Sequence, residues 1–285
     1  MTNIAASIRA KLLNMARKEH IPFQRILTLY KQEGILYRLV MTRYSKDIVL
    51  KGGLLFYQIQ GFIARPTKDI DLLGLDISSS ETLLLDILTE ACTIDIEDGL
   101  RFDSSSIEVK PITGQTEHGG VRAWITAYLD NARTRLQIDM GFGDVITGGP
   151  VNRPYRTLLG NRSFSIQTYS DETVAAEKLE ALVSRGTVNS RYKDLYDLYE
   201  LLIEAELNDE SVITAACNTF NNRNTALPEL PESLSELYWS SDPFEIDWNR
   251  YLKRIGASGP DQVQLRKVLL PKIQSIYKSI RARSI

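Results

Sequence analysis

Two kinds of hydrophobic spacing divide the chain into a mixed first part and a helical second part. Apolar positions at helical intervals predict helices over residues 4–15 and 23–39. Short apolar runs bounded by glycine and polar residues then predict β-strands, with short helices between them over 54–62 and 81–92, the latter opened by the capping signal "SSSE". The predicted strands cover residues 47–53, 68–75, 106–112, 121–130, 134–144 and 163–169. This succession predicts a mixed β-sheet flanked by helices.

Two connections in this first part are also predicted from local residues. The segment "DNAR" joins two strongly β-forming runs, so we expect a hairpin there. The segment "TGGPVNRP" over residues 147–154 is rich in glycine and proline, and it is expected to be a connection between strands.

From Asp171 onward the hydrophobic spacing is helical. The segment "DETVAAEKLEALVSRG" starts with acidic residues and ends at Gly186, as helices do, and "SRYKDLYDLYELLIEAEL" follows it. More helices are predicted over residues 209–221, 243–254 and 260–282. We therefore expect an α+β fold with an N-terminal α/β lobe of residues 1–168 and a C-terminal helical lobe of residues 169–285.

The strand predicted over residues 68–75 carries two acidic residues on one side. Asp69 and Asp71 are two positions apart, so their side chains project from the same face, whereas Ile70 projects from the other. Two carboxylates this close raise the pKa of one of them unless a cation lies between them, and Mg²⁺ prefers oxygen ligands of this kind. The alternative is an edge strand with a solvated acidic face.

A glycine turn and a third carboxylate favour the metal-site interpretation. Gly52 and Gly53 end the preceding strand and lead into a helix, where backbone N–H groups and the lack of side chains allow a phosphate to approach. Asp139 lies on another predicted strand between apolar residues. Three acidic side chains that converge opposite a glycine turn are typical of metal-dependent phosphoryl or nucleotidyl transfer.

The helical lobe contains cations that suit a triphosphate. Lys178 and Arg185 are seven positions apart on one predicted helix, which places them on one face. On the next helix Lys193 is followed by Asp194 and Asp197, and these two acids share a face from which they are able to orient Lys178 or Arg185. The alternative is an exposed pair of helices with ordinary ion pairs.

Composition excludes several classes of protein. The chain has 285 residues, of which 43% are hydrophobic, so it is long enough to bury a substantial core. No stretch has the apolar length that crosses a bilayer, and cations are spread through the first 20 residues as in an amphipathic helix rather than a signal peptide. Cys92 and Cys217 support neither a disulfide framework nor a zinc site. We expect a cytoplasmic protein without a membrane partner.

The net charge of −2 hides basic segments at both ends of the chain. Residues 1–46 contain nine Lys and Arg against two acids, and residues 262–285 contain six against none. If the two segments meet in space, they form a positive surface that suits a polyanion. The alternative is that both are ordinary solvated helix faces.

Several segments resemble the AbiEii/AbiGii-type nucleotidyltransferase toxins, which have a DNA polymerase β-like catalytic core. The matching segments occur in the order of the family and are "VLKGGLLF", "RPTKDIDLL", "GGVRAWITAYLDNARTRLQIDMGFGD" and "ETVAAEKLEALVSRGTVNSRYKDLYDLY". Because "QRILTLYKQEGILYRL" ahead of them is also similar, the resemblance covers at least residues 1–200. Leu54 follows the glycines where many members have a small polar residue, so the turn would contact phosphate through its backbone alone.

The resemblance implies a metal-dependent nucleotidyltransferase site. Asp69 and Asp71 would bind the catalytic Mg²⁺, with Mn²⁺ as the alternative ion. Asp139 would be the third acidic residue of the site and a further metal ligand. Lys178 and the region of Asp194 would complete the nucleotide pocket, with the nucleotide between the two lobes.

Two residues ahead of the paired aspartates are further candidates for phosphate contacts. Thr67 lies two positions before Asp69 on the same side of the strand, where its hydroxyl could contact phosphate, and Arg65 could neutralise the triphosphate. The alternatives are a β-forming residue at the start of a strand and an arginine in a surface ion pair.

Members of this family are toxins of two-gene toxin–antitoxin or abortive-infection systems, and some resemble transferases that add nucleotides to the tRNA 3′ end. The resemblance implies that this chain transfers NMP from an NTP, with tRNA as the leading acceptor, a block of translation as the result and an antitoxin from an adjacent gene as partner. Two alternatives stay open: transfer to a small molecule or a protein side chain, and an inactive module that binds NTP.

Overall fold

The structure is a computed structural model that describes residues 4–75, 77, 79–112, 119–187, 192–256 and 259–284. The chain forms two compact units, each with its own core. Unit 1 comprises Met1–Gly143 and Val151–Thr168, and unit 2 comprises Asp144–Pro150 and Tyr169–Ile285. The chain therefore enters unit 2 twice, briefly after Gly143 and finally after Thr168.

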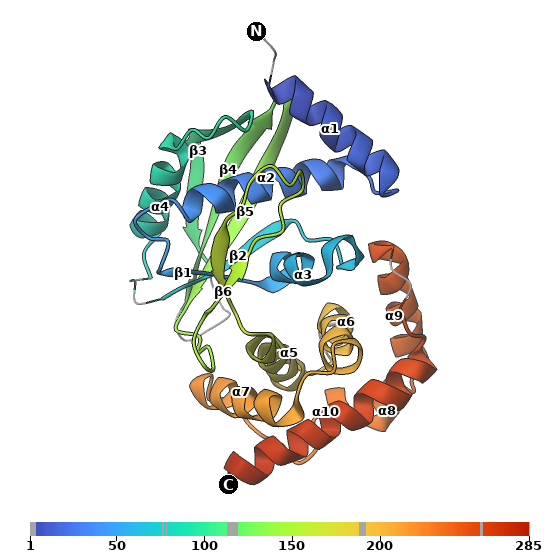
Figure 1. Ribbon diagram of the computed structural model, residues 1–285. Helices are drawn as coiled ribbons and strands as arrows, with labels where there is room; N and C mark the ends of the chain where they lie inside the picture. The colour runs from blue at the N-terminus through green and yellow to red at the C-terminus, as the bar shows by residue number, and fades with distance from the viewer. Residues whose placement is uncertain are drawn as a thin grey trace. The chain divides into compact units, whose positions relative to one another are not determined.

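Unit 1 is built on a mixed sheet of seven strands in the order β3-β4-β5-β2-β1-β7-β6 (Figure 1). The strands are β1 (Ile48–Lys51), β2 (Asp69–Gly74), β3 (Leu100–Pro111), β4 (Gly120–Leu129), β5 (Ala132–Phe142), β6 (Val151–Pro154) and β7 (Ser165–Thr168). β2 pairs with β5, and β1 with β7, in parallel, whereas the other pairs are antiparallel. The predicted mixed sheet is confirmed, and so is the hairpin, in which Asp130 adopts φ 51° at the turn.

The described helices of unit 1 begin and end close to the predicted positions. They are α1 (Ile4–Lys18), α2 (Phe23–Leu39), α3 (Gly52–Gln60), which continues into a 3₁₀ turn at Gly61–Ile63, and α4 (Glu81–Thr93). The side chain of Ser80 caps α4 by accepting a hydrogen bond from the N–H of Leu83. Helices α2 and α4 pack on the apolar face of β3, β4 and β5, where alternate side chains such as Ile125 and Ile138 are fully buried.

A buried lysine fixes α2 to the hairpin of β4 and β5. The ammonium of Lys31 donates hydrogen bonds to the carbonyl of Ala132 (2.8 Å) and to the hydroxyl of Thr134 (2.7 Å). Burial lowers the pKa of Lys31 to about 8. These contacts hold the start of β5, the strand that also carries Asp139, in a defined place.

Two predictions about the strands differ from the structure. Part of the expected connection "TGGPVNRP" forms strand β6, and β3 begins at Leu100, six residues earlier than predicted. β6 is a short strand at the edge of the sheet that ends in Pro154, and its exposed side chains lack the alternation by which strands are recognised. The extra length of β3 contains a bulge between Asp103 and Glu108, which breaks the period of two.

The regular secondary structure of unit 2 is helical among its described residues, with loops between the helices. Its helices are α5 (Asp171–Arg185), α6 (Tyr192–Tyr199) with a π-helical turn at Glu200–Glu204, α7 (Asp209–Asn222), a 3₁₀ turn at Glu232–Leu234, α8 (Glu236–Trp239), α9 (Asp242–Ile255) and α10 (Gln262–Ser284). Among these, the one-turn α8 and the 3₁₀ turn at Glu232–Leu234 have no counterpart in the prediction. The α+β fold class is thus confirmed.

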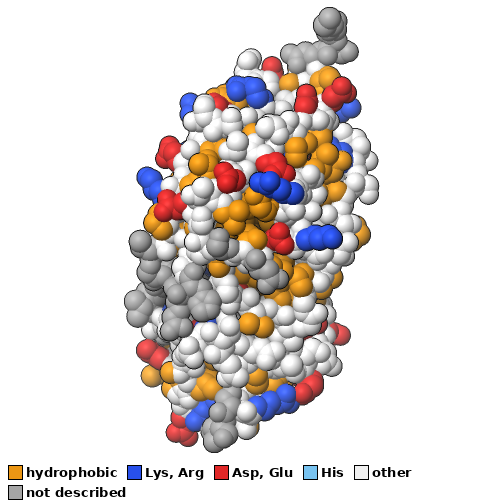
Figure 2. All heavy atoms as spheres, turned by 90° about the vertical axis from the view of Figure 1, so that its left-hand side faces the viewer, with side chains coloured by type: hydrophobic (Ala, Val, Ile, Leu, Met, Phe, Trp, Pro, Cys, Tyr) orange, Lys and Arg blue, Asp and Glu red, His pale blue; other side chains and the backbone are white. Residues whose placement is uncertain are grey.

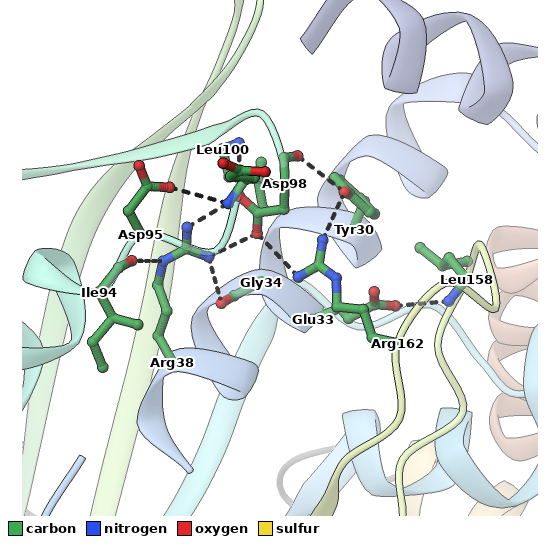
Figure 3. Close-up of polar contacts among 11 residues, drawn as sticks. Tyr30, Glu33, Gly34, Arg38, Ile94, Asp95, Asp98, Leu100, Leu158 and Arg162 are labelled. Carbon is green, nitrogen blue, oxygen red and sulfur yellow. Dashed lines mark hydrogen bonds and ion pairs between the residues drawn. The ribbon is translucent and has the colours of Figure 1, made fainter. Parts of the chain in front are cut away.

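Figure 3 shows a buried group of charged and polar side chains that connects α2 with two loops of unit 1. The carboxylate of Asp98 accepts hydrogen bonds from Arg38 (2.8 and 3.0 Å) and from Arg162 (3.1 Å), and its side chain is fully buried. Burial alone would raise the pKa of Asp98, but the hydrogen bonds and charge of Arg38 hold it below its usual value. Tyr30 joins the group by accepting from Arg162 and donating to the Asp98 carbonyl.

Glu33 lies beside this group and predicts a pH dependence of stability. Burial raises the pKa of Glu33 to about 7, although its carboxylate accepts a hydrogen bond from the N–H of Leu158. The folded protein therefore binds one proton more than the unfolded chain between about pH 4.5 and pH 7, so the free energy of unfolding falls as the pH rises through this range. Glu33→Gln removes this penalty. It should be more stable than the parent at pH 8 by about 3 kcal/mol and nearly equal at pH 4.5.

Urea unfolding at both pH values measures this difference. Glu19→Gln, at an exposed position directly after α1, is the control that should change neither value. A stability difference that is the same at pH 4.5 and pH 8 would contradict the assignment to Glu33.

The outer side of unit 1 that carries α4 and β3 has no charge of predominantly one sign among its described residues. Lys and Arg side chains lie there beside Asp and Glu, scattered among hydrophobic groups (Figure 2).

Candidate functional site

Asp69 and Asp71 lie on the same face of β2, as their spacing predicts. Both are half-buried, whereas Ile70 and Leu72 between and after them are fully buried on the opposite face. β2 lies between β5 and β1 in the interior of the sheet. The alternative of an edge strand with a solvated acidic face is therefore wrong.

Strand register places a row of charged residues across the sheet beside these aspartates. Asp71 is the register partner of Lys51 on β1 and of Asp139 on β5, and Asp139 is in turn the partner of Arg122 on β4. Register partners share a face, so the row alternates in sign from one strand to the next except at the two neighbouring aspartates. The structure thus brings Asp139 next to Asp71, on the face that the sequence analysis expected.

Arg122 forms a bidentate ion pair with Asp139. Its Nε and Nη2 donate to the two carboxylate oxygens at 2.7 Å each, and the exposed fractions of the side chains are 37% for Arg122 and 18% for Asp139. The hydrogen bond with Asp139 raises the pKa of Arg122 above its usual value, and the charges of Asp139, Asp69 and Asp71 raise it further. Arg122 therefore supplies part of the positive charge that the acidic residues require.

Arg122 is not among the residues predicted for the site, although the sequence contains a signal for it. The two-residue hairpin turn makes Leu129 the partner of Ala132, and counting back along both strands places Arg122 opposite Asp139. An expected hairpin thus predicts its cross-strand pairs once the turn is located.

Gly52 is required where β1 passes into α3. Its φ is +67°, which side chains rarely allow, and a Cβ at this position would lie 2.0 Å from a carboxylate oxygen of Asp71. α3 begins at this glycine without a side-chain cap from Lys51, so the N-terminal end of the helix lies next to Asp71. The glycine turn and the paired aspartates therefore form one site.

Arg65 and Thr67 lie against the second glycine of this turn. A Cβ on Gly53 would lie 2.8 Å from the Thr67 hydroxyl and 3.1 Å from a guanidinium nitrogen of Arg65. The Thr67 hydroxyl donates a hydrogen bond to the carbonyl of Asp69 at 3.2 Å, which fixes the start of β2. All the residues predicted for this site in unit 1 are thus brought together around the turn.

In unit 2, Lys178 on α5 contacts two acids of α6. Its ammonium lies 2.7 Å from Asp194 and 2.8 Å from Asp197, and the exposed fractions of these side chains are 14%, 2% and 1% in that order. The alternative of an exposed ion pair between helices is therefore not what the structure contains. Arg185 is half-buried in the last turn of α5, and Lys193 is exposed.

Unit 2 also contains a cluster of three acids around Arg223, which was not predicted. Arg223 forms ion pairs of 2.7 Å with Asp144, Glu177 and Glu180. Burial alone would lower the pKa of Arg223. The charges of Glu177 and Asp144 outweigh this effect and raise the pKa above its usual value. Since Asp144 belongs to the first passage of the chain through unit 2, this cluster fastens that passage to α5 and α7.

The basic segments at the two ends of the chain belong to different units, α1 to unit 1 and α10 to unit 2. Several cations of α10 are paired with acids within unit 2: Arg266 with Glu236, Lys272 with Asp209, and Arg283 with Glu210. Their charge is therefore partly neutralised.

The acidic residues of unit 1 fit a divalent cation that is shared with a phosphate substrate. Within the described ranges, no three His, Cys, Asp or Glu side chains form a group able to hold a metal ion by themselves, and Asp139 is engaged by Arg122. Asp69 and Asp71 lie as a pair on one face of β2, beside the glycine turn. Mg²⁺ commonly uses one or two carboxylates together with substrate phosphates, so the donor set suits this ion.

Comparisons with known proteins concern the family and the fold of the chain. The family model described as "Nucleotidyl transferase AbiEii toxin, Type IV TA system" matches residues 34–279. Two solved structures from Helicobacter pylori are similar in fold at 16% identity: JHP933, with a TM-score of 0.53 over 92% of this chain and 95% of that chain, and a candidate nucleotidyltransferase, with 0.54 over 92% and 98%. No curated protein matches the chain significantly. In the described part of the chain, no helix combines the length and hydropathy that a membrane span requires.

Proposed function

Because the chain belongs to the AbiEii family of nucleotidyltransferase toxins from type IV toxin–antitoxin systems, we propose that it transfers NMP from an NTP to the 3′ end of tRNA and thereby blocks translation. One observation carries the location of the chemistry in unit 1. The Asp71 carboxylate lies against the glycine turn so closely that only glycine fits at position 52. A helix N-terminus and two carboxylates on one strand face thus meet at one point, which suits a phosphate with its cation.

Within this proposal, each residue of the site in unit 1 has a role in binding the cation or the phosphates. Asp69 and Asp71 bind Mg²⁺, or Mn²⁺ in its place, which when bound neutralises charge on the triphosphate. The backbone N–H groups of Gly52 and Gly53 bind phosphate oxygens, and Arg65 and Thr67 support that contact. Asp139 is the third acidic residue, and its ion pair with Arg122 keeps it in place.

The reaction proposed is an in-line displacement at the α-phosphate. The acceptor hydroxyl forms a new P–O bond, its proton passes to a carboxylate of the site, and the bond between the α- and β-phosphates breaks to release pyrophosphate. Lys178 and Asp194 are proposed as the catalytic residues of unit 2, since the two acids of α6 hold the ammonium in a defined orientation. Arg185, Lys193 and Asp197 are proposed as nucleotide contacts.

The acceptor and the partner are also part of the proposal. Phosphate neutralisation by Lys and Arg accounts for most non-specific affinity for nucleic acids, and α1 contributes exposed cations such as Arg17 and Lys18. The type of system named by the family model supports a cognate antitoxin as partner.

One experiment tests the proposed function. Purified protein is incubated with Mg²⁺, each of the four labelled NTPs in turn, and total cellular RNA or protein. We expect label in the tRNA fraction together with release of pyrophosphate. Label in a protein or a small molecule would instead identify a different acceptor, and nucleotide binding without pyrophosphate release would identify an inactive module.

A further inference from the structure

The second face of β3, β4 and β5 carries cations and aromatic rings in a regular arrangement. Register pairs Tyr128 on β4 with Arg101 and Arg133 on its two sides, and pairs Trp124 with Glu108 and Gln137. The residues that form this arrangement are here called the cation–aromatic face and are Arg101, Lys110, Trp124, Tyr128, Arg133 and Arg135. Register partners share a face, so this is the same face on which Arg122 and Asp139 lie.

The aromatic rings hold the cations in place. The guanidinium of Arg101 lies 4.0 Å from the centre of the Tyr128 ring, and the Trp124 ring is contacted by Arg135 at 5.1 Å and Lys110 at 5.7 Å. Trp124 and Tyr128 are half-buried, whereas the four cations are exposed. Long cationic side chains that are already ordered lose less conformational entropy when they bind a ligand.

The charge of this face is positive although the whole protein has a net charge of −2. Four cations lie there with two acids, Asp103 and Glu108, in addition to the internally paired Arg122 and Asp139. Glu108 is paired with Arg135 at 2.8 Å, and both side chains are about half exposed. An exposed pair of this kind is weak, so Arg135 is free to exchange Glu108 for another anion.

The position of the face indicates its ligand. Arg133 lies six residues before Asp139 on β5, about 20 Å away along an ordinary strand, and Arg135 lies between them. Asp69 is next to Gln137 in the neighbouring strand, so the face leads directly to the paired aspartates. An extended chain of phosphates fits a line of cations with aromatic rings, which is the chemistry by which single-stranded nucleic acids are bound.

We propose that the cation–aromatic face binds the single-stranded 3′ segment of the acceptor RNA and directs its terminal hydroxyl toward Asp69 and Asp71. The proposal rests on the proposed function for the identity of the acceptor. The binding itself is independent of catalysis and is measured without nucleotide.

The test measures the affinity of the full chain for a fluorescein-labelled single-stranded oligoribonucleotide at several salt concentrations. The variant Arg101→Gln/Arg133→Gln/Arg135→Gln should bind about 10-fold or more weakly at low salt, and the slope of log K against log salt should fall by about 2, since each lost phosphate contact removes about 0.7. The matched control is Arg250→Gln/Lys253→Gln/Arg254→Gln on α9, which removes the same charge from exposed positions elsewhere in the chain. It should change affinity and slope much less.

Trp124 provides a second readout that needs no charge change. Trp239 and Trp248 are fully buried in unit 2, so Trp124 is the one half-buried tryptophan among the three of the chain, all of which are described. RNA should change the tryptophan emission of the parent protein, and this change should be absent in Trp124→Phe.

Several outcomes would overturn the inference. They are unchanged RNA affinity of the triple variant, an equal loss in the α9 control, or displacement of RNA by poly-glutamate as effectively as by unlabelled RNA, which would indicate an acidic protein as ligand. Asp71→Asn should bind RNA like the parent. Failure of the proposed function is separate, because it appears as a parent protein that binds RNA through this face but transfers no NMP.

Discussion

Asp71→Asn is expected to lower the rate of NMP transfer by about 10³-fold or more while the protein stays folded. Asp71 is central to the site because it is next to Asp139 in register and lies against the glycine turn. The substitution keeps the size of the side chain and removes the negative charge that we propose to bind a divalent cation. Because Asp69 and Asp71 repel each other on one face, loss of one charge should leave the free energy of unfolding unchanged or slightly higher.

The measurement is single-turnover transfer from labelled NTP at saturating Mg²⁺, together with urea unfolding of the same preparation. Asp69→Asn should behave in the same way, since both carboxylates face the same side of β2. Asp86→Asn is the matched control, because Asp86 is exposed on α4 and its substitution changes the net charge equally. Transfer by Asp71→Asn within tenfold of the parent would contradict the assignment of this carboxylate to the cation.

Features of the site that depend on neighbouring residues could be predicted from the sequence. The alternation of apolar and acidic residues in β2 is sufficient to place Asp69 and Asp71 on one face, since the strand period is two. The turn at Gly52 and the start of a helix after it follow from the glycine pair and the apolar residues behind it. Both expectations needed no knowledge of the rest of the fold.

Features that depend on strand order and distant partners could not be predicted in the same way. Hydrophobic spacing carries no information about which strands pair, so the interior position of β2 appears only in the structure. An interaction of Lys178 with the acids of α6 could be predicted, because α5 and α6 are consecutive. The burial of this ion pair could not be predicted. Arg223 reaches Asp144 across 79 positions, and no local pattern marks such a pair.

Asp98 is the clearest case of a residue whose role only the structure reveals, and its replacement should have the largest effect on stability. Asp98→Asn leaves Arg38 and Arg162 buried with one neutral partner instead of a carboxylate. Removal of one member of a buried ion pair typically costs about 3–5 kcal/mol, because an uncompensated charge remains in the interior. We expect a loss of this size in the free energy of unfolding at pH 7, measured by urea titration with circular dichroism.

Two further variants separate charge compensation from a local packing effect. Asp95 is exposed and lies three positions before Asp98 in the same loop. Asp95→Asn should therefore lower the free energy of unfolding by less than about 1 kcal/mol. Arg162→Met in the Asp98→Asn background removes one of the two uncompensated guanidinium groups, and it should therefore recover part of the lost stability, although the same substitution in the parent protein should be destabilising. If the effects of Asp98→Asn and Arg162→Met were simply additive, the carboxylate would not be there to balance the arginines, because independent sites add whereas members of one ion cluster do not.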